Sequence, residues 1–119
     1  MPEKSVLDKL LYKPGQRAAV LDAPATYEAP IGATRTLSGP VDFLHVFVTR
    51  RDDVLKDGRG WREALAPKGI FWASYPKGKA VATDLNRDKL REALQEVGLE
   101  AVSQVAIDDT WSALRAKPV

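Results

Sequence analysis

The chain of 119 residues contains no cysteine and a single histidine, His45. The missing thiols exclude disulfides, thiolate catalysis and every cysteine-based metal site. A zinc site built on one imidazole would need three carboxylates around it, and the sequence shows no such cluster. We therefore expect neither a metal nor another cofactor, and no catalytic residue stands out.

Long apolar runs are also missing. No stretch approaches the roughly 18 consecutive apolar residues that a transmembrane helix needs. The first residues lack the basic and then apolar pattern of a secretory signal. Together with the lack of cysteine, these absences favour a cytoplasmic protein that does not enter a membrane.

A strong excess of one charge is the third absence. Eighteen basic residues stand against sixteen acidic residues, which gives a net charge of +2. Such a small and dispersed excess does not indicate a nucleic-acid partner. The length suits a single domain, residues 1–119, with one hydrophobic core.

What is present is a regular alternation of apolar runs, which predicts an α/β fold. An N-terminal helix is expected to follow a capping box at 5–8. Further helices are expected at 52–65, broken by Gly58 and Gly60, and at 86–97. The pair Thr83-Asp84 is expected to cap the second of these helices. The predicted strands span 16–22, 34–37, 42–49, 69–75, 99–107 and 111–116.

The order of these elements predicts a three-layer, Rossmann-like sheet that is mostly parallel and ends in an antiparallel hairpin. The stretch 65–78, L-A-P-K-G-I-F-W-A-S-Y-P-K-G, is the most informative part. It combines a helix end, a buried strand and a loop. In open α/β sheets, ligands bind beyond the carboxyl ends of the strands. The loop at 75–79 is therefore expected to border a crevice.

Several motifs carry a family resemblance. K-P-G followed by an apolar strand (13–21), D-F-L (42–44), L-A-P-K-G-I-F-W (65–72) and the terminal hairpin together resemble a reduced Rossmann-like methyltransferase core. More narrowly, Y-P-K-G (75–78), T-D-L (83–85) and D-D-T-W-S-A-L-R (108–115) resemble a family of small bacterial proteins catalogued as a domain of unknown function. The resemblance implies the methyltransferase-like fold and assigns no activity.

The sequence departs from the methyltransferase pattern where the methyl donor would bind. The first strand should end in a glycine-rich turn, which lets the backbone approach an adenosyl group. It ends instead in L-D-A-P-A (21–25), and no glycine appears until Gly32. The second strand is not followed by an acidic residue for ribose hydroxyls. We therefore expect an inactive relative that does not bind S-adenosylmethionine. Asp22 either contacts a ligand or caps a turn.

A group of polar side chains follows the third and fourth strands of this scheme. Arg50 comes after one strand, and Tyr75, Lys77 and Lys79 come after the next. The carboxyl ends of parallel strands share one edge, so these residues and Asp22 are the predicted ligand contacts. Clustered cations would hold a phosphate or carboxylate. Alternatively they are solvated loop charges, with the arginine neutralised by nearby aspartates.

These observations favour a non-catalytic binding or regulatory domain with a crevice for a small anionic ligand. One alternative is a protein-interaction module, or a homo-oligomer, whose ancestral pocket is filled by side chains. A further alternative is a diverged methyltransferase. The predicted strand at 42–49 is apolar on both faces, as expected for a central strand. His45 lies inside it, which indicates a core histidine with satisfied hydrogen bonds and not a catalytic base.

Overall fold

The computed structural model describes residues 10–13, 15–25, 27, 33–37, 40–77 and 81–118. The predicted capping box at 5–8 lies outside these residues, and so does Lys79.

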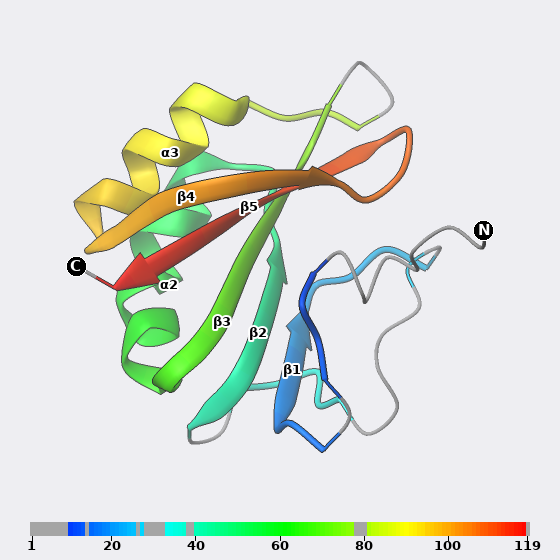
Figure 1. The fold of residues 1–119 in the computed structure, drawn as a ribbon. Coiled ribbons are helices and arrows are strands. Elements are labelled where there is room, and N and C mark those ends of the chain that lie inside the picture. The colour runs from blue at the N-terminus through cyan, green and yellow to red at the C-terminus, as the bar shows by residue number, and fades with distance from the viewer. Residues whose placement is uncertain are drawn as a thin grey trace.

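Five strands form one mixed sheet in the order β1-β2-β3-β5-β4 (Figure 1). The strands are β1 (Ala18–Leu21), β2 (Val41–Phe47), β3 (Leu65–Pro76), β4 (Leu99–Ala106) and β5 (Trp111–Pro118). β2 pairs in parallel with β1 and β3, whereas β5 pairs antiparallel with β3 and β4. The predicted hairpin is confirmed, but a mostly parallel sheet is not matched. The reason is that β5 lies between β3 and β4 and runs antiparallel to both of them.

The two described helices cover the same face of the sheet (Figure 1). They are α2 (Arg51–Ala64) and α3 (Arg87–Glu96). In the part of the chain that the structure describes, the opposite face is covered by non-helical segments that contribute Leu10, Tyr12 and Tyr27. The predicted three-layer arrangement is therefore not matched, because the described part of the connection from β1 to β2 contains no helix.

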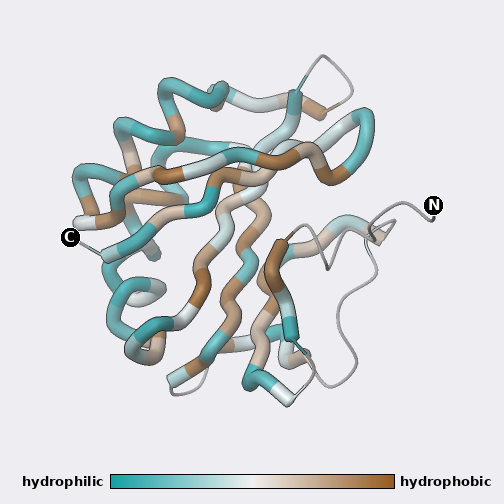
Figure 2. The backbone as a smooth tube through the Cα atoms, in the orientation of Figure 1, coloured by the Kyte–Doolittle hydropathy of each residue, from teal (hydrophilic) through white to brown (hydrophobic). Residues whose placement is uncertain are grey.

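The central strand β2 is buried on both faces, as its sequence predicts. Leu44 and Val46 belong to the large cluster under the helices. Phe43 belongs to a second cluster on the other face, where the indole nitrogen of Trp72 donates to the carbonyl of Leu10 at 2.7 Å. Figure 2 shows apolar residues recurring along the central strands, with hydrophilic residues concentrated on the helices. This pattern fixes which residues face each side.

The helix α2 runs without a break through Gly58 and Gly60, so the predicted interruption is wrong. The structure shows why a glycine stands at 58. A Cβ built there would lie 2.6 Å from Cγ2 of Val97. Gly58 thus allows close contact between α2 and the C-terminal end of α3, and this packing outweighs the low helix propensity of glycine.

The helix α3 begins and ends close to the predicted positions. Asn86 caps it, since its Oδ1 accepts a 2.9 Å hydrogen bond from the backbone N–H of Lys89. Gly98 ends it with φ at +83°. The strand predicted at 34–37 is reduced to one parallel bridge between Thr34 and Ala19.

Candidate functional site

A cleft of about 850 Å³ opens at the carboxyl end of β1. It lies at the edge of the sheet where ligands of open α/β folds bind. We call it the β1 cleft. Its described lining residues are Val20, Asp22, Ala23, Pro24, Ala25, Tyr27, Ala33, Thr34 and Arg35.

Asp22 places a carboxylate in this cleft. It directly follows β1 and has φ at +59°, a left-handed conformation that is uncommon outside glycine but tolerated by aspartate. This conformation turns the chain away from the strand. The structure records no ion pair or side-chain hydrogen bond from Asp22 to another described residue. Asp22 thus lies at the edge where a ligand was predicted, and its role as a ligand contact stays a prediction.

Arg35 places a cation in the same cleft, and the sequence analysis missed it. The neighbouring Thr34 bridges to Ala19 of β1, which carries Arg35 to the side of that strand. Within the described ranges, Arg35 makes no ion pair either. The short strand predicted at 34–37 was the available signal, because a strand beside β1 would bring its residues to this edge.

Tyr27 forms one wall of the cleft, and its hydroxyl is hydrogen-bonded to a side chain of the sheet. Its hydroxyl lies 3.0 Å from Nδ1 of His45, and Nε2 of His45 lies 2.5 Å from Oγ of Ser74. The His45 ring also stacks on Phe47 with centroids 4.4 Å apart. This chain of contacts anchors the wall of the cleft to β2 and β3. The expectation of a core histidine with satisfied hydrogen bonds is confirmed.

Burial controls the charge state of this chain of side chains. It lowers the pKa of His45 to about 3, so the imidazole is neutral near pH 7. It also raises the pKa of the Tyr27 hydroxyl, which stays protonated. A neutral imidazole has one donor and one acceptor nitrogen. His45 therefore satisfies both hydroxyl partners without carrying a charge into the core.

Arg50 and Lys77 are not among the lining residues of the β1 cleft. Arg50 is exposed at the start of α2, after β2, and Lys77 is half-buried after β3. The backbone N–H of Lys77 donates to the carbonyl of Thr110 at 2.7 Å. Neither side chain makes an ion pair with another described residue. The two cations thus follow the neighbouring strands β2 and β3, and neither lines the cleft that contains Asp22.

Tyr75 faces the helices. It is buried in the cluster beneath them, and its hydroxyl accepts a 2.9 Å hydrogen bond from Nε2 of Gln104 on β4. Burial raises the pKa of this hydroxyl. Tyr75 is therefore engaged with the hairpin, and its hydroxyl is not among the groups that line the β1 cleft.

A short segment crosses the strand ends between these residues. The hydroxyl of Thr83 donates to the carbonyl of Thr49 at 2.6 Å, and Oδ1 of Asp84 accepts from the backbone N–H of Arg51 at 2.9 Å. The sequence suggested that 83–84 caps the helix starting at 86, but Asp84 caps α2 instead. Its carboxylate already supplies the negative charge favoured at the N-terminus of α2.

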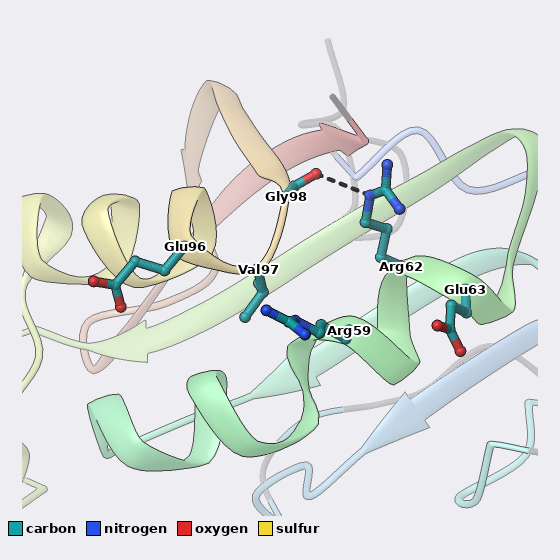
Figure 3. A pocket seen from close by; sticks show the side chains of 6 residues that line it. All are labelled: Arg59, Arg62, Glu63, Glu96, Val97 and Gly98. Atoms are coloured by element: carbon teal, nitrogen blue, oxygen red, sulfur yellow. Dashed lines mark hydrogen bonds between the residues drawn. The ribbon is translucent and has the colours of Figure 1, made fainter.

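A smaller cavity, of about 290 Å³, lies between the C-terminal parts of α2 and α3 (Figure 3). Nε of Arg62 donates to the carbonyl of Gly98 at 3.2 Å, while Glu96 points away and pairs with Arg51 at 2.9 Å. Two arginines and two glutamates line this cavity, so their charges balance. The hydrogen bond between Arg62 and Gly98 connects α2 to the end of α3. The balanced lining favours neither an anionic nor a cationic ligand.

Among the described residues, no group of three histidine, cysteine or acidic side chains is placed to hold a metal ion. No described helix combines the length and apolar character required to cross a membrane.

The arrangement resembles known structures. The mitomycin 7-O-methyltransferase MmcR matches with a TM-score of 0.59 and 10% identity, over 71% of this chain and 31% of its own. The CcbJ methyltransferase from Streptomyces caelestis matches with a TM-score of 0.54 and 9% identity, over 72% and 64%. LepI in complex with S-adenosylmethionine matches with a TM-score of 0.58 and 14% identity, over 96% and 39%.

These likenesses define the class of fold: the chain has a methyltransferase-like fold. At such identities they show the fold alone, and the chain spans less than two thirds of the length of each of these proteins. No protein-family model and no curated protein matches the sequence. The narrower resemblance to a family of small bacterial proteins stays a prediction.

Proposed function

We propose that this chain is a non-catalytic binding domain that takes a small anionic ligand in the β1 cleft. The observation that carries the proposal is a pair of charges, Asp22 and Arg35, that lie in a cleft of about 850 Å³ at the end of β1 and make no ion pair with another described residue. Charges of both signs in one cleft are suited to a ligand that carries complementary groups.

The lining residues suggest distinct roles. Arg35 is suited to a phosphate or carboxylate, because a guanidinium donates two parallel hydrogen bonds to such groups. Asp22 accepts hydrogen bonds and is suited to a hydroxyl or ammonium group of the same ligand. Ala23, Pro24 and the Tyr27 ring supply apolar walls. The preferred ligand is thus a small polar molecule with an anionic group at one end.

Methyl transfer is the less favoured reading. LepI has been seen with S-adenosylmethionine, but the turn after β1 here contains Pro24, which lacks an N–H donor, and no glycine up to Ala25. A backbone of this kind is poorly suited to approach an adenosyl group. A diverged methyltransferase remains the weaker alternative.

The predicted cations after β2 and β3 offer a second place for an anion. Lys77, with Arg50 and Lys79, would bind it there, and the segment at 83–84 already crosses these strand ends. If instead no ligand binds at the strand ends, the alternative of an interaction module with a filled pocket is favoured. The hydrogen bond between Tyr75 and Gln104 is an example of such filling.

A ligand screen separates these readings. Nucleotides and phosphorylated metabolites are tested by thermal shift on the parent, on Arg35→Ala and on Lys77→Ala. We expect Arg35→Ala to weaken the best binder about tenfold or more, since a charge-assisted contact contributes roughly 1.5–3 kcal/mol. Lys77→Ala should change the affinity little. The reverse ranking would move the site to the β3 end, and equal binding by all three proteins would reject both assignments.

A further inference from the structure

We propose that the free edge of β4 binds an acidic peptide in an extended conformation. The proposed surface is a groove between α3 and β4, at the opposite edge of the sheet from the β1 cleft, and it is independent of the ligand proposed there. We call it the β4 groove. Its lining residues are Arg87, Arg91, Ala101, Val102, Ser103, Gln104 and Leu114.

The edge itself has the properties of a docking strand. β4 is the last strand of the sheet, so its outer backbone groups have no partner strand among the described residues. Its eight residues include no lysine and no proline, and Glu100 is the one charged side chain. Natural edge strands are commonly protected by lysine, proline or a covering segment. The opposite edge, β1, is in fact bridged by Thr34.

The shape of β4 leaves a short regular stretch available. The pairing with β5 shifts between Ala101 and Ser103, which marks a bulge at Val102. Val102 is 47% exposed, and among the described large apolar residues only Leu11, at 43%, is also exposed. Beyond the bulge, 103–106 pair regularly with β5. A peptide strand would therefore align along 103–106 and cover Val102 at one end.

The charge of the groove selects the partner. Both charged lining residues, Arg87 and Arg91, are cations on successive turns of α3. Arg87 pairs with Asp88 at 3.5 Å, but these side chains are 65% and 76% exposed, so the pair is weak. Arg91 has no ion pair with another described residue. Acidic side chains on alternate positions of a bound strand would face these arginines.

A second copy of this chain matches the groove less well. Paired through its own β4, it would bring one acidic residue, Glu100, to the edge. Ala101 packs in the cluster under the helices, whereas Val105 packs in the cluster on the opposite face of the sheet. A strand with acids on every second position meets the two arginines better than β4 does.

The test uses a fluorescein-labelled peptide of about ten residues that alternates glutamate and valine. Fluorescence anisotropy compares its affinity for the parent protein, for Arg91→Glu and for Arg59→Glu. Arg59 is exposed on α2 and outside the groove, so it provides the same charge change elsewhere. We expect about a tenfold loss with Arg91→Glu and less than about a twofold loss with Arg59→Glu. Unchanged melting temperatures confirm that both variants fold.

A second peptide tests the backbone pairing. It keeps the glutamates and replaces the valines with proline, which cannot donate to a strand. We expect it to bind at least about tenfold more weakly. The proposal is overturned if the proline peptide binds equally well, if both arginine variants lose the same affinity, or if the first peptide does not bind at millimolar concentration. A dimer in sedimentation that Val102→Lys dissociates would also overturn it, by assigning the edge to a second copy.

Discussion

At the scale of single residues, the buried chain from Tyr27 through His45 to Ser74 is the most informative feature. All three side chains are polar, yet they lie in a region of aromatic and apolar packing. Each hydrogen-bonding partner removes the desolvation cost of the others. The sequence predicted a core histidine from the apolar run around it. It could not predict the two partners, because Tyr27 and Ser74 are distant in the chain and meet His45 only in the folded sheet.

His45→Ala should lower the free energy of unfolding by about 2 kcal/mol or more. The substitution leaves a cavity against Phe47 and deprives the hydroxyls of Tyr27 and Ser74 of their partner. Urea unfolding followed by circular dichroism measures the change. Ser74→Ala is the milder control and should cost less. A His45→Ala protein as stable as the parent would contradict the assignment of His45 to the core.

The stability should also depend on pH through His45. Its pKa is about 3 in the folded protein and 6.5 in an unperturbed histidine. Between these values the unfolded chain binds a proton that the folded chain does not. Stability is therefore fully present above pH 6.5 and is lost as the pH falls toward 3, by up to about 1.4 kcal/mol per pH unit.

The control for this pH dependence is His45→Gln, which keeps two hydrogen-bonding groups but does not titrate. Urea unfolding at a series of pH values gives the difference between the two proteins, in which the contributions of the carboxylates cancel. We expect the parent to lose stability faster than the variant below pH 6.5. Parallel curves would contradict this account, because they would show that folding does not lower the pKa of His45.

At the scale of elements, packing overrode several local signals. Gly58 and Gly60 predicted a broken helix, but α2 is continuous, and Gly58 accommodates Val97, the residue that follows α3. The Thr83–Asp84 pair predicted a cap for the following helix, but Asp84 caps α2, which precedes it. Asp84 was correctly predicted to contact the N-terminal end of a helix. Which helix it caps depends on contacts that a single sequence does not display.

The two glycines of α2 provide a matched pair of substitutions. Gly58→Ala should destabilise the protein by about 1–3 kcal/mol, because its Cβ would lie 2.6 Å from Cγ2 of Val97. Gly60→Ala should stabilise it by about 0.5–1 kcal/mol, since nothing lies within 4 Å and alanine favours a helix. Thermal unfolding of both variants measures the difference. Equal effects of the same sign would contradict the close contact between α2 and α3.

At the scale of the whole molecule, the alternation of apolar runs predicted the α/β class, the double burial of β2 and the terminal hairpin. The three-layer arrangement and the mostly parallel sheet that the sequence predicted do not match the structure. Tight turns indicate an antiparallel pair, but no local pattern shows that β5 enters between β3 and β4. Asp22 was predicted at the carboxyl edge of the sheet, and the structure places it there beside the β1 cleft, whereas its role as a ligand contact stays a prediction. Arg35 was missed because it reaches that edge through one bridge at Thr34.

The fold alone does not imply methyl transfer, and we expect no measurable binding of S-adenosylmethionine. The turn after β1 contains Pro24 and alanines where a close backbone approach requires glycine. Isothermal titration calorimetry is the measurement. An affinity tighter than about 100 μM, roughly −5.5 kcal/mol, would contradict this expectation and favour a diverged methyltransferase.

The most direct test of the central claim is an NMR titration of the ¹⁵N-labelled protein with the best binder from the panel of nucleotides and phosphorylated metabolites. We predict that the shifted amides cluster at 22, 23, 25, 27 and 33–35, around the β1 cleft, and that Arg35→Ala moves the midpoint of the titration to at least about tenfold higher ligand concentration. Shifts centred on Arg50 and Lys77 instead, or the absence of any binder in the panel, would contradict a site at the end of β1.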